Sequence, residues 1–217
     1  MRTSRRQNAV TFIEQEHVSA IIRTKDQQLA SDAIRAAEEG GFRVVEFTLT
    51  TPGAMELIAE FSRSANLLVG AGTVLTRGQA REAVGCGARF LVSPIADREI
   101  IEEAATLDVA CLPGAFTPME METAYRWGAD FIKVFPAPPG GVSFIEAVLA
   151  PLPHLKLFPT AGFTEENFLD YLNAGCAGVG FVRPLFDASD LRDRNFTAIR
   201  ARAAMIIRRR DQWKSRR

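Results

Sequence analysis

A repeated unit restricts the fold of this chain more than any other feature: a short apolar run, a turn and an amphipathic segment recur from residue 18 onward. Four units place a glycine-containing phrase before the apolar run, at residues 39–42, 84–88, 127–129 and 174–177. Self-similarity of this kind indicates one supersecondary element that is used many times.

The repeat predicts eight strands, each followed by a helix. We expect the strands at residues 19–23, 43–49, 67–70, 89–92, 109–112, 131–135, 155–159 and 178–182, and the helices at 26–39, 52–64, 77–84, 97–106, 118–127, 142–149, 165–173 and 196–213. Apolar runs of this length suit a parallel sheet that is covered on both faces. The prediction is therefore an α/β fold, a (β/α)8 TIM barrel. An open doubly wound sheet, the alternative, normally has fewer strands and a glycine-rich first loop, and residues 23–26 contain no glycine.

Composition indicates one soluble domain over residues 1–217, with a short basic N-terminal segment (1–15) and a basic C-terminal helix (196–217). Apolar residues make up 47% and charged residues 24%, and the formal net charge is zero, which favours neither nucleic acid nor a membrane surface as partner. The arginines at the two ends are interpreted as solvated. Three scattered cysteines, no secretory signal and no apolar run of ~20 residues predict a cytoplasmic protein.

Chemistry in such barrels is found at the C-terminal ends of the strands. The residues predicted there are Arg23, Glu46, Thr48, Thr50, Gly72, Thr73, Ser93, Pro94, Pro113, Gly114, Lys133, Phe135, Thr160, Gly162, Gly180 and Arg183. Branched apolar side chains fill most barrel interiors. Two ionisable residues predicted to lie in this interior, Glu46 and Lys133, therefore require a functional explanation.

Lys133 is a single amine in an apolar strand, and side-chain alternation places it on one face with Phe131 and Phe135. Desolvation there disfavours the ammonium form and lowers the pKa of the amine. A neutral amine can attack a ketone and form a Schiff base. The alternative is an edge-strand lysine whose head group extends to water.

Glu46 shares a strand face with Val44, Thr48 and Thr50. If this face is directed inward, a carboxylate and the Lys133 amine enter one barrel from opposite sides. A buried structural ion pair is the alternative, but it is seldom more stable than an apolar core of equal volume. We therefore expect the carboxylate to be the proton-transfer partner of the amine.

Two further positions each admit two interpretations. Thr73 offers a hydroxyl and exposed backbone N–H groups, or serves as a helix cap. Gly162 presents N–H groups to an anion at a helix N-terminus, or forms only a turn. The two histidines, His17 and His154, have no second ligand nearby in sequence, and no P-loop, dinucleotide motif or Ser/His/Asp arrangement is present, so no metal and no cofactor are expected.

Three stretches carry a family resemblance: GFRVVEFTL at residues 41–49, GAGTVL at 70–75, and FIKVFPA at 131–137 followed by two glycines at 140 and 141. They resemble the 2-keto-3-deoxy-6-phosphogluconate (KDPG) aldolases, and the likeness extends from residue 18 to residue 186. The resemblance implies a homotrimeric TIM barrel, a class I aldolase that cleaves KDPG reversibly to pyruvate and D-glyceraldehyde 3-phosphate without a metal.

By position, the resemblance implies that Lys133 is the Schiff-base lysine and Glu46 the general acid/base. It places the pyruvate part against Thr73, Pro94 and Phe135, and the phosphate end at Gly162 and the loop around Arg183. Two departures concern the substrate.

The family phrase after the glutamate usually ends in an arginine that holds the carboxylate, and here that position is Thr50. The usual Gly-Ser after strand 8 is Val182-Arg183. A guanidinium is a strong anion partner. Arg183 therefore either replaces the missing phosphate donors or indicates a different substrate tail, and Arg23 could supply the missing carboxylate cation.

Five alternatives stay open at this point. The same chemistry would act on 4-hydroxy-2-oxoglutarate, 2-keto-3-deoxy-6-phosphogalactonate or an unphosphorylated keto acid. A function of another class is a non-catalytic barrel that binds a small anion. A ribulose-phosphate-binding barrel of biosynthesis would fit the phosphate loops but leave the Glu46 and Lys133 pair unexplained. Fold alone does not choose among them.

Overall fold

The computed structural model describes residues 4–217, so the first three residues, Arg2 of the basic N-terminal segment among them, lie outside the description. The strands are β1 (Val18–Ile22), β2 (Val44–Thr48), β3 (Leu68–Gly72), β4 (Phe90–Val92), β5 (Ala110–Leu112), β6 (Gly114–Ala115), β7 (Ile132–Val134), β8 (Leu157–Pro159) and β9 (Val179–Phe181). The helices are α1 (Arg5–Glu16), α2 (Gln27–Glu39), α3 (Ala54–Phe61), α4 (Arg77–Gly85), α5 (Arg98–Thr106), α6 (Pro118–Arg126), α7 (Val142–Leu149), α8 (Phe168–Asn173), α9 (Ala188–Arg192) and α10 (Phe196–Lys214).

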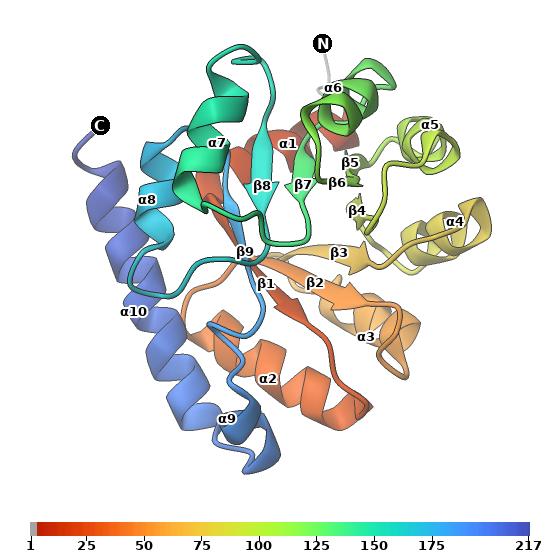
Figure 1. The fold of residues 1–217 in the computed structure, drawn as a ribbon. Coiled ribbons are helices and arrows are strands. Elements are labelled where there is room, and N and C mark those ends of the chain that lie inside the picture. The colour runs from red at the N-terminus through yellow and green to blue at the C-terminus, as the bar shows by residue number, and fades with distance from the viewer. Residues whose placement is uncertain (1–3) are drawn as a thin grey trace.

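Parallel strands form a ring that the helices surround (Figure 1). One run of pairing has the order β5-β4-β3-β2-β1-β9 and the other β6-β7-β8. Pro113 alone separates β5 from β6, so these two segments together are the fifth barrel strand. Between β8 and β9 the Ala177 N–H donates to the Leu157 carbonyl at 2.9 Å. The (β/α)8 barrel that the repeat predicts is confirmed.

Alternation along β2 separates two apolar layers. Val44 belongs to the cluster inside the barrel, while Val45 and Phe47 belong to the larger cluster between the strands and the surrounding helices. Glu46, between them, therefore points inward with Val44, as the pattern predicts. The inward face of a second strand brings Lys133 to the same interior.

Helix α1 corrects the expectation of a basic segment without a role in the fold. Three of its residues, Ala9, Val10 and Ile13, join the apolar cluster inside the barrel. The Arg6 side chain donates to Asp130, at 2.9 and 3.0 Å, and to the Gly128 carbonyl, which fixes the start of the helix to the barrel. Sequence reasoning missed α1 because its few apolar residues form one short face and most of its other residues are polar.

Helix α10 uses its arginines within the molecule. Arg210 is buried and pairs with Glu16 of α1 at 2.6 Å, and Arg202 pairs with Asp190 at 2.8 Å. Arg209 donates to the carbonyls of Glu165 and Glu166. The interpretation of these three arginines as solvated charges is therefore wrong. They attach the last helix to α1, α9 and the loop before α8.

Two helices begin two or more residues later than predicted, and α9, like α1, was not predicted. Gly53, at φ 69°, precedes α3, which therefore starts at Ala54 rather than residue 52. The Thr164 N–H donates to the Asn167 side chain at 2.7 Å, and this turn delays α8 to Phe168. Helix α9 has only five residues, too few for a visible period.

Four helices end in the same backbone motif. Gly41, Gly87, Gly128 and Gly175 have φ between 98° and 110°, which side chains other than glycine rarely adopt. The residue after each glycine donates its N–H to a carbonyl five positions earlier, as Phe42 does to Ala37 at 3.0 Å. The glycine phrases of the repeat are thus helix-ending signals, although Gly85 itself lies inside α4.

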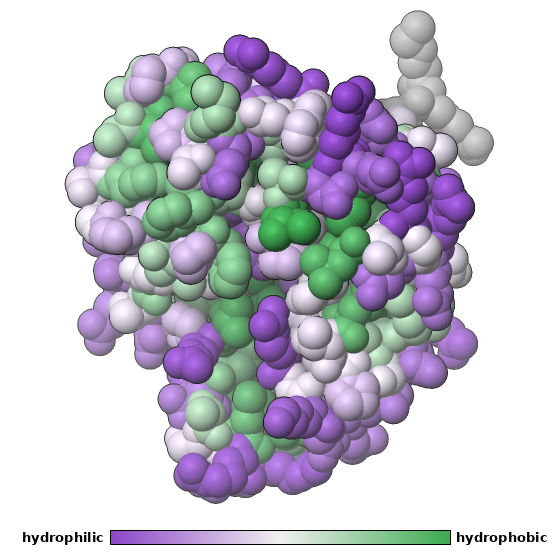
Figure 2. Space-filling view, turned by 45° about the vertical axis from the view of Figure 1, so that its right-hand side comes forward, coloured by the Kyte–Doolittle hydropathy of each residue, from purple (hydrophilic) through white to green (hydrophobic). Residues whose placement is uncertain are grey.

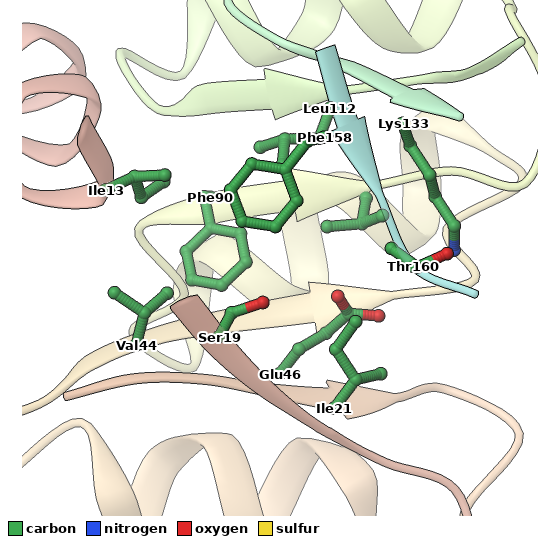
Figure 3. Close-up of a pocket in the computed structure, with 11 residues that line it drawn as sticks. Ile13, Ser19, Ile21, Val44, Glu46, Phe90, Leu112, Lys133, Phe158 and Thr160 are labelled. Carbon is green, nitrogen blue, oxygen red and sulfur yellow. The ribbon is translucent and has the colours of Figure 1, made fainter. Parts of the chain in front are cut away.

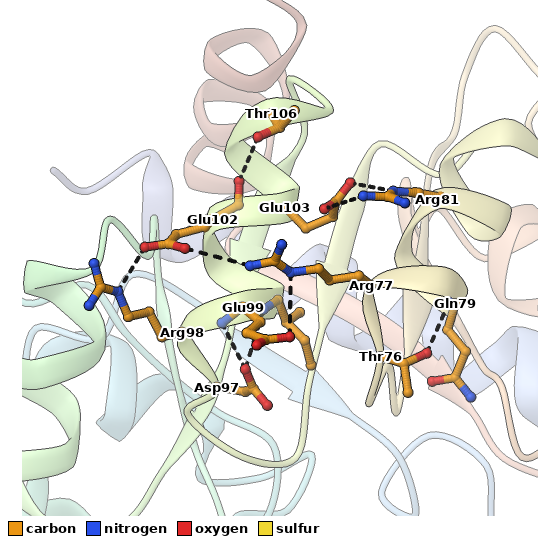
Figure 4. A network of polar contacts seen from close by, with 11 residues as sticks. Thr76, Arg77, Gln79, Arg81, Asp97, Arg98, Glu99, Glu102, Glu103 and Thr106 are labelled. Carbon is orange, nitrogen blue, oxygen red and sulfur yellow. Dashed lines mark hydrogen bonds and ion pairs between the residues drawn. The ribbon is translucent and has the colours of Figure 1, made fainter.

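Charged side chains connect α4 to α5 on the outer surface (Figure 4). Arg81 donates twice to Glu103, at 2.8 and 3.1 Å, and Arg77 lies within 4 Å of Glu99 and Glu102. These bonds lower the pKa of the Glu103 carboxyl. The network accounts for this charge cluster without a ligand.

We expect Ile13→Ala to lower the free energy of unfolding, because Ile13 is only 1% exposed and its side chain closes the barrel interior. The expected loss is about 2–4 kcal/mol. Urea unfolding measures it, with the exposed Thr11→Ala of the same helix as control. Equal stability of the two variants would mean that α1 does not seal the barrel.

Candidate active site

A cavity of about 530 Å³ opens at the C-terminal ends of the strands. It is lined by Ile21, Arg23, Glu46, Lys133, Phe135, Thr160, Ala161, Gly162, Phe163, Val182, Arg183 and Pro184. Six predicted site residues are among these: Arg23, Glu46, Lys133, Phe135, Gly162 and Arg183. The structure thus brings together residues from positions 23 to 183 of the chain.

Lys133 lies in β7, between β6 and β8, and is 7% exposed. This excludes the edge-strand alternative. Burial lowers the pKa of its amine; the negative charge of Glu46 opposes this shift and the positive charge of Arg23 adds to it. The amine lies 5.1 Å from the centroid of the Phe135 ring, which is 40% exposed at the cavity mouth.

Glu46 in β2 is 2% exposed, and its Oε1 has no hydrogen-bond partner among residues 4–217. Burial raises the pKa of its carboxyl, while Lys133 and Arg23 lower it. The neighbouring strand leaves space for it only because residue 72 is glycine: a Cβ there would stand 1.8 Å from Oε1. Gly72 is therefore required for the position of the carboxylate.

The amine of Lys133 and the carboxylate of Glu46 extend into the same space from two walls of the barrel (Figure 3). They share both the mouth cavity and a small interior cavity of about 10 Å³ below it. No nitrogen–oxygen distance of 4.0 Å or less joins them within the described chain, so the structural ion pair is not formed. Each charge still shifts the pKa of the other group.

Two arginines give the mouth of the cavity a positive charge. Arg23 donates to the Thr73 hydroxyl at 3.2 Å, and Thr73 has φ 60°, an uncommon value for threonine. Arg183 is exposed and has no carboxylate within 4.0 Å among the described residues. Both guanidinium groups are in position to attract an anionic ligand.

Three predicted binding residues do not line the cavity. Thr50 is exposed and its hydroxyl bonds to that of Thr48 at 3.2 Å. Pro94 is half-buried, and its carbonyl packs against Gly114. Thr73 reaches the cavity only through Arg23. Of the two interpretations of Gly162, the helix N-terminus does not apply, because α8 begins six residues later, which leaves Gly162 in a loop.

Two polar residues of the interior had no role assigned to them, although Thr160 was among the residues predicted at the strand ends. Thr160, at the end of β8, is buried and lines both cavities; Ser19 of β1 is buried and lines the lower one. Figure 3 draws the Thr160 hydroxyl beside the Lys133 amine, and Ser19 on the other side of the Glu46 carboxylate. Their signal was a polar residue at an inward position of a strand, the same signal that identified Glu46.

The histidines have partners within the fold. The His17 ring bonds to the Ala177 carbonyl and the His154 ring to Glu122, both at 2.8 Å. From residue 4 to residue 217 no group of His, Cys, Asp and Glu has the arrangement of a metal site. None of the helices in this range combines the length and apolar character that a membrane span requires.

A closed parallel barrel with a buried lysine and a buried glutamate in one cavity at the strand ends has the architecture of a TIM-barrel enzyme. A sequence profile of the family "KDPG and KHG aldolase" matches residues 10–202. The chain belongs to this family of aldolases, which are carbon–carbon lyases.

Individual proteins agree with the family assignment. A probable 2-dehydro-3-deoxy-6-phosphogalactonate aldolase of Rhizobium meliloti is 35% identical over 84% of this chain and 89% of its own. A 2-dehydro-3-deoxy-phosphogluconate aldolase of Pseudoalteromonas atlantica is 32% identical over 77% and 80%. The KDPG aldolase of Legionella pneumophila, solved with pyruvate as a covalent carbinolamine, has a TM-score of 0.82 and 28% identity over 91% of this chain and 97% of its own.

We expect Glu46→Gln to lower the pKa of Lys133 further, because the charge of Glu46 is the one influence that raises it. Competitive acetylation at a series of pH values, read by mass spectrometry, measures the amine's titration. Lys156, exposed and paired with Glu14, is an internal control whose profile stays unchanged. A higher pKa for Lys133 in the variant would contradict the electrostatic description.

Proposed function

We propose that the chain is a class I aldolase that cleaves KDPG reversibly to pyruvate and D-glyceraldehyde 3-phosphate. Lys133 is the nucleophile and Glu46 the general acid/base. The observation that carries this proposal is the placement of these two buried groups in one cavity, with a lowered pKa for the amine and a raised pKa for the carboxyl. Groups with shifts of this kind are matched to nucleophilic and proton-transfer work.

The catalytic cycle begins when the neutral Lys133 amine attacks the C2 carbonyl of the keto acid. Glu46 transfers protons as the carbinolamine loses water to give an iminium ion. Glu46 then accepts the proton of the C4 hydroxyl, directly or through a water molecule. The C3–C4 bond breaks, its electrons form an enamine, and the aldehyde leaves. Protonation at C3 and hydrolysis of the iminium ion release pyruvate and restore the amine.

Two anionic groups of the substrate match the two cations at the mouth. Arg23, together with the Thr73 hydroxyl that it contacts, would hold the carboxylate in place of the arginine absent at Thr50. Thr50 itself, together with Pro94, then lies outside the proposed binding site. Arg183 and the loop at Gly162 would hold the phosphate.

Related substrates are the second candidates, and the relatives favour one in particular. The chain is 35% identical to a probable 2-dehydro-3-deoxy-6-phosphogalactonate aldolase, so the C4 epimer of KDPG is a candidate of nearly equal standing. Keto acids without a second anionic group would leave Arg183 unused, and 4-hydroxy-2-oxoglutarate would offer it only a short carboxylate tail. A non-catalytic anion-binding barrel would leave the buried Lys133 and Glu46 unexplained.

We further propose a single-domain, cytoplasmic homotrimer. Leu75, Ile95 and Met119, which follow β3, β4 and β6, are large apolar residues exposed at the surface. Apolar residues also gather in the central part of the face drawn in Figure 2, between polar margins. Exposed apolar groups of this kind favour association with further copies of the chain.

Borohydride reduction in the presence of pyruvate should leave a stable adduct on Lys133, identified by peptide mass spectrometry. Lys133→Ala should abolish the adduct and turnover, while Lys156→Ala keeps both. Glu46→Gln should retain the adduct and slow turnover by ~10²–10⁴-fold. Turnover by Lys133→Ala without an adduct would refute the Schiff-base mechanism.

Arg183→Ala should raise the KM for KDPG by about 10-fold, because it removes a charged partner of the phosphate. The KM for an unphosphorylated keto acid should stay unchanged. Arg63→Ala, which removes an exposed arginine in the segment between α3 and β3, is the matched control. Equal losses for both substrates would show that Arg183 does not select a phosphorylated tail.

A further inference from the structure

Tyr171 is a buried tyrosine of α8 that lies directly behind the wall of the active-site cavity. It is 1% exposed, and its hydroxyl donates to the Gly162 carbonyl at 2.6 Å. The tyrosine itself does not line the cavity, whereas Gly162 and Phe163 do. Its ring also meets the Phe163 ring edge-on, with the centroids 5.6 Å apart.

The bond to Gly162 sets the direction of one peptide group. The peptide between Gly162 and Phe163 is trans, and in a trans peptide the C=O and N–H point in opposite directions. Because the carbonyl points toward Tyr171, the Phe163 N–H points to the other side, where the cavity lies. This N–H has no hydrogen-bond partner among residues 4–217. It is therefore available to a ligand anion.

The hydroxyl is confined between two loops of the site. A Cβ at Gly141, in the loop after β7, would stand 2.9 Å from the Tyr171 hydroxyl, and one at Gly162 would stand 3.4 Å from it and 3.1 Å from the Ala137 Cβ. Burial raises the pKa of Tyr171, so the phenol keeps the proton that it donates. The side chain therefore holds the Gly162 loop in one position.

We propose that Tyr171 is a positioning residue for the anionic end of the substrate: its hydroxyl orients the peptide after Gly162 so that the Phe163 N–H faces the cavity. Tyr171 acts through this peptide and does not touch the substrate. The identity of the anion as a phosphate ester rests on the proposed function. The orientation of the peptide does not.

Tyr171→Phe removes the hydroxyl and keeps the ring, and Tyr125→Phe, at the only other tyrosine and exposed, is the matched control. We expect Tyr171→Phe to raise the KM for KDPG by about 5- to 20-fold, the effect of one lost hydrogen bond. The kcat should change by less than about 2-fold, and adduct formation with pyruvate, which has no tail, should be unchanged. Gly162→Ala, which strains the same peptide at φ 89°, should likewise raise the KM for KDPG.

Inorganic phosphate provides a readout that needs no catalysis. It should raise the Tm of the wild-type protein and of Tyr125→Phe, and raise that of Tyr171→Phe clearly less. If the wild type forms no pyruvate adduct, the aldolase proposal fails while this phosphate difference still supports the role of Tyr171. The inference is overturned if phosphate does not raise the Tm of the wild type. It is also overturned if Tyr171→Phe equals Tyr125→Phe in the KM for KDPG and in the phosphate response. A Tyr171→Phe variant whose kcat, adduct yield and unliganded Tm all fall together would overturn it as well, because that result indicates a general loss of structure.

Discussion

Removal of two opposite charges from water is the constraint on which this structure depends. Burial works against the ionised form of both groups, so it lowers the pKa of the Lys133 amine and raises that of the Glu46 carboxyl. Their mutual attraction opposes both shifts, but the two groups are not joined by an ion pair within 4.0 Å. A buried pair of opposite charges contributes little to the stability of a fold. We therefore explain this pair by the chemistry that it allows.

The rest of the barrel maintains this arrangement. Ile13 of α1 closes the interior below the pair, Gly72 leaves the space that the carboxylate occupies, and the apolar cluster inside the barrel fills the remainder. Arg210 of the last helix holds α1 in place through Glu16. Solvent therefore approaches the pair only from the mouth, where Arg23 and Arg183 lie.

The barrel, the inward direction of Glu46 and the burial of Lys133 follow from periodicity, which depends only on local geometry. The glycines that end helices were predictable for the same reason. Helix α1 was not predictable, because its three buried residues pack against the barrel interior, and the local pattern does not show this tertiary contact. The start of α8 depends on a side-chain turn at Asn167, which the apolar pattern does not report.

Within the site, family resemblance predicted positions but not contacts. Thr50 and Pro94 lie at strand ends but do not line the cavity. The Thr50 hydroxyl bonds to that of Thr48, and the Pro94 carbonyl packs against Gly114. Thr160 and Ser19 line the interior although no role was assigned to them, because a hydroxyl within a strand is usually a packing residue. Tyr171 lies behind the wall, where only the hydrogen bond to Gly162 reveals it.

The protonation state of Lys133 tests this account most directly. The chain has four lysines, Lys25, Lys133, Lys156 and Lys214, so an NMR pH titration of side-chain-labelled lysine resolves few signals. The account predicts that the Lys133 amine of the wild-type protein titrates at a lower pH than the other three. A midpoint equal to theirs or higher would contradict it, because the amine would then be an ordinary ammonium at the pH where the enzyme works.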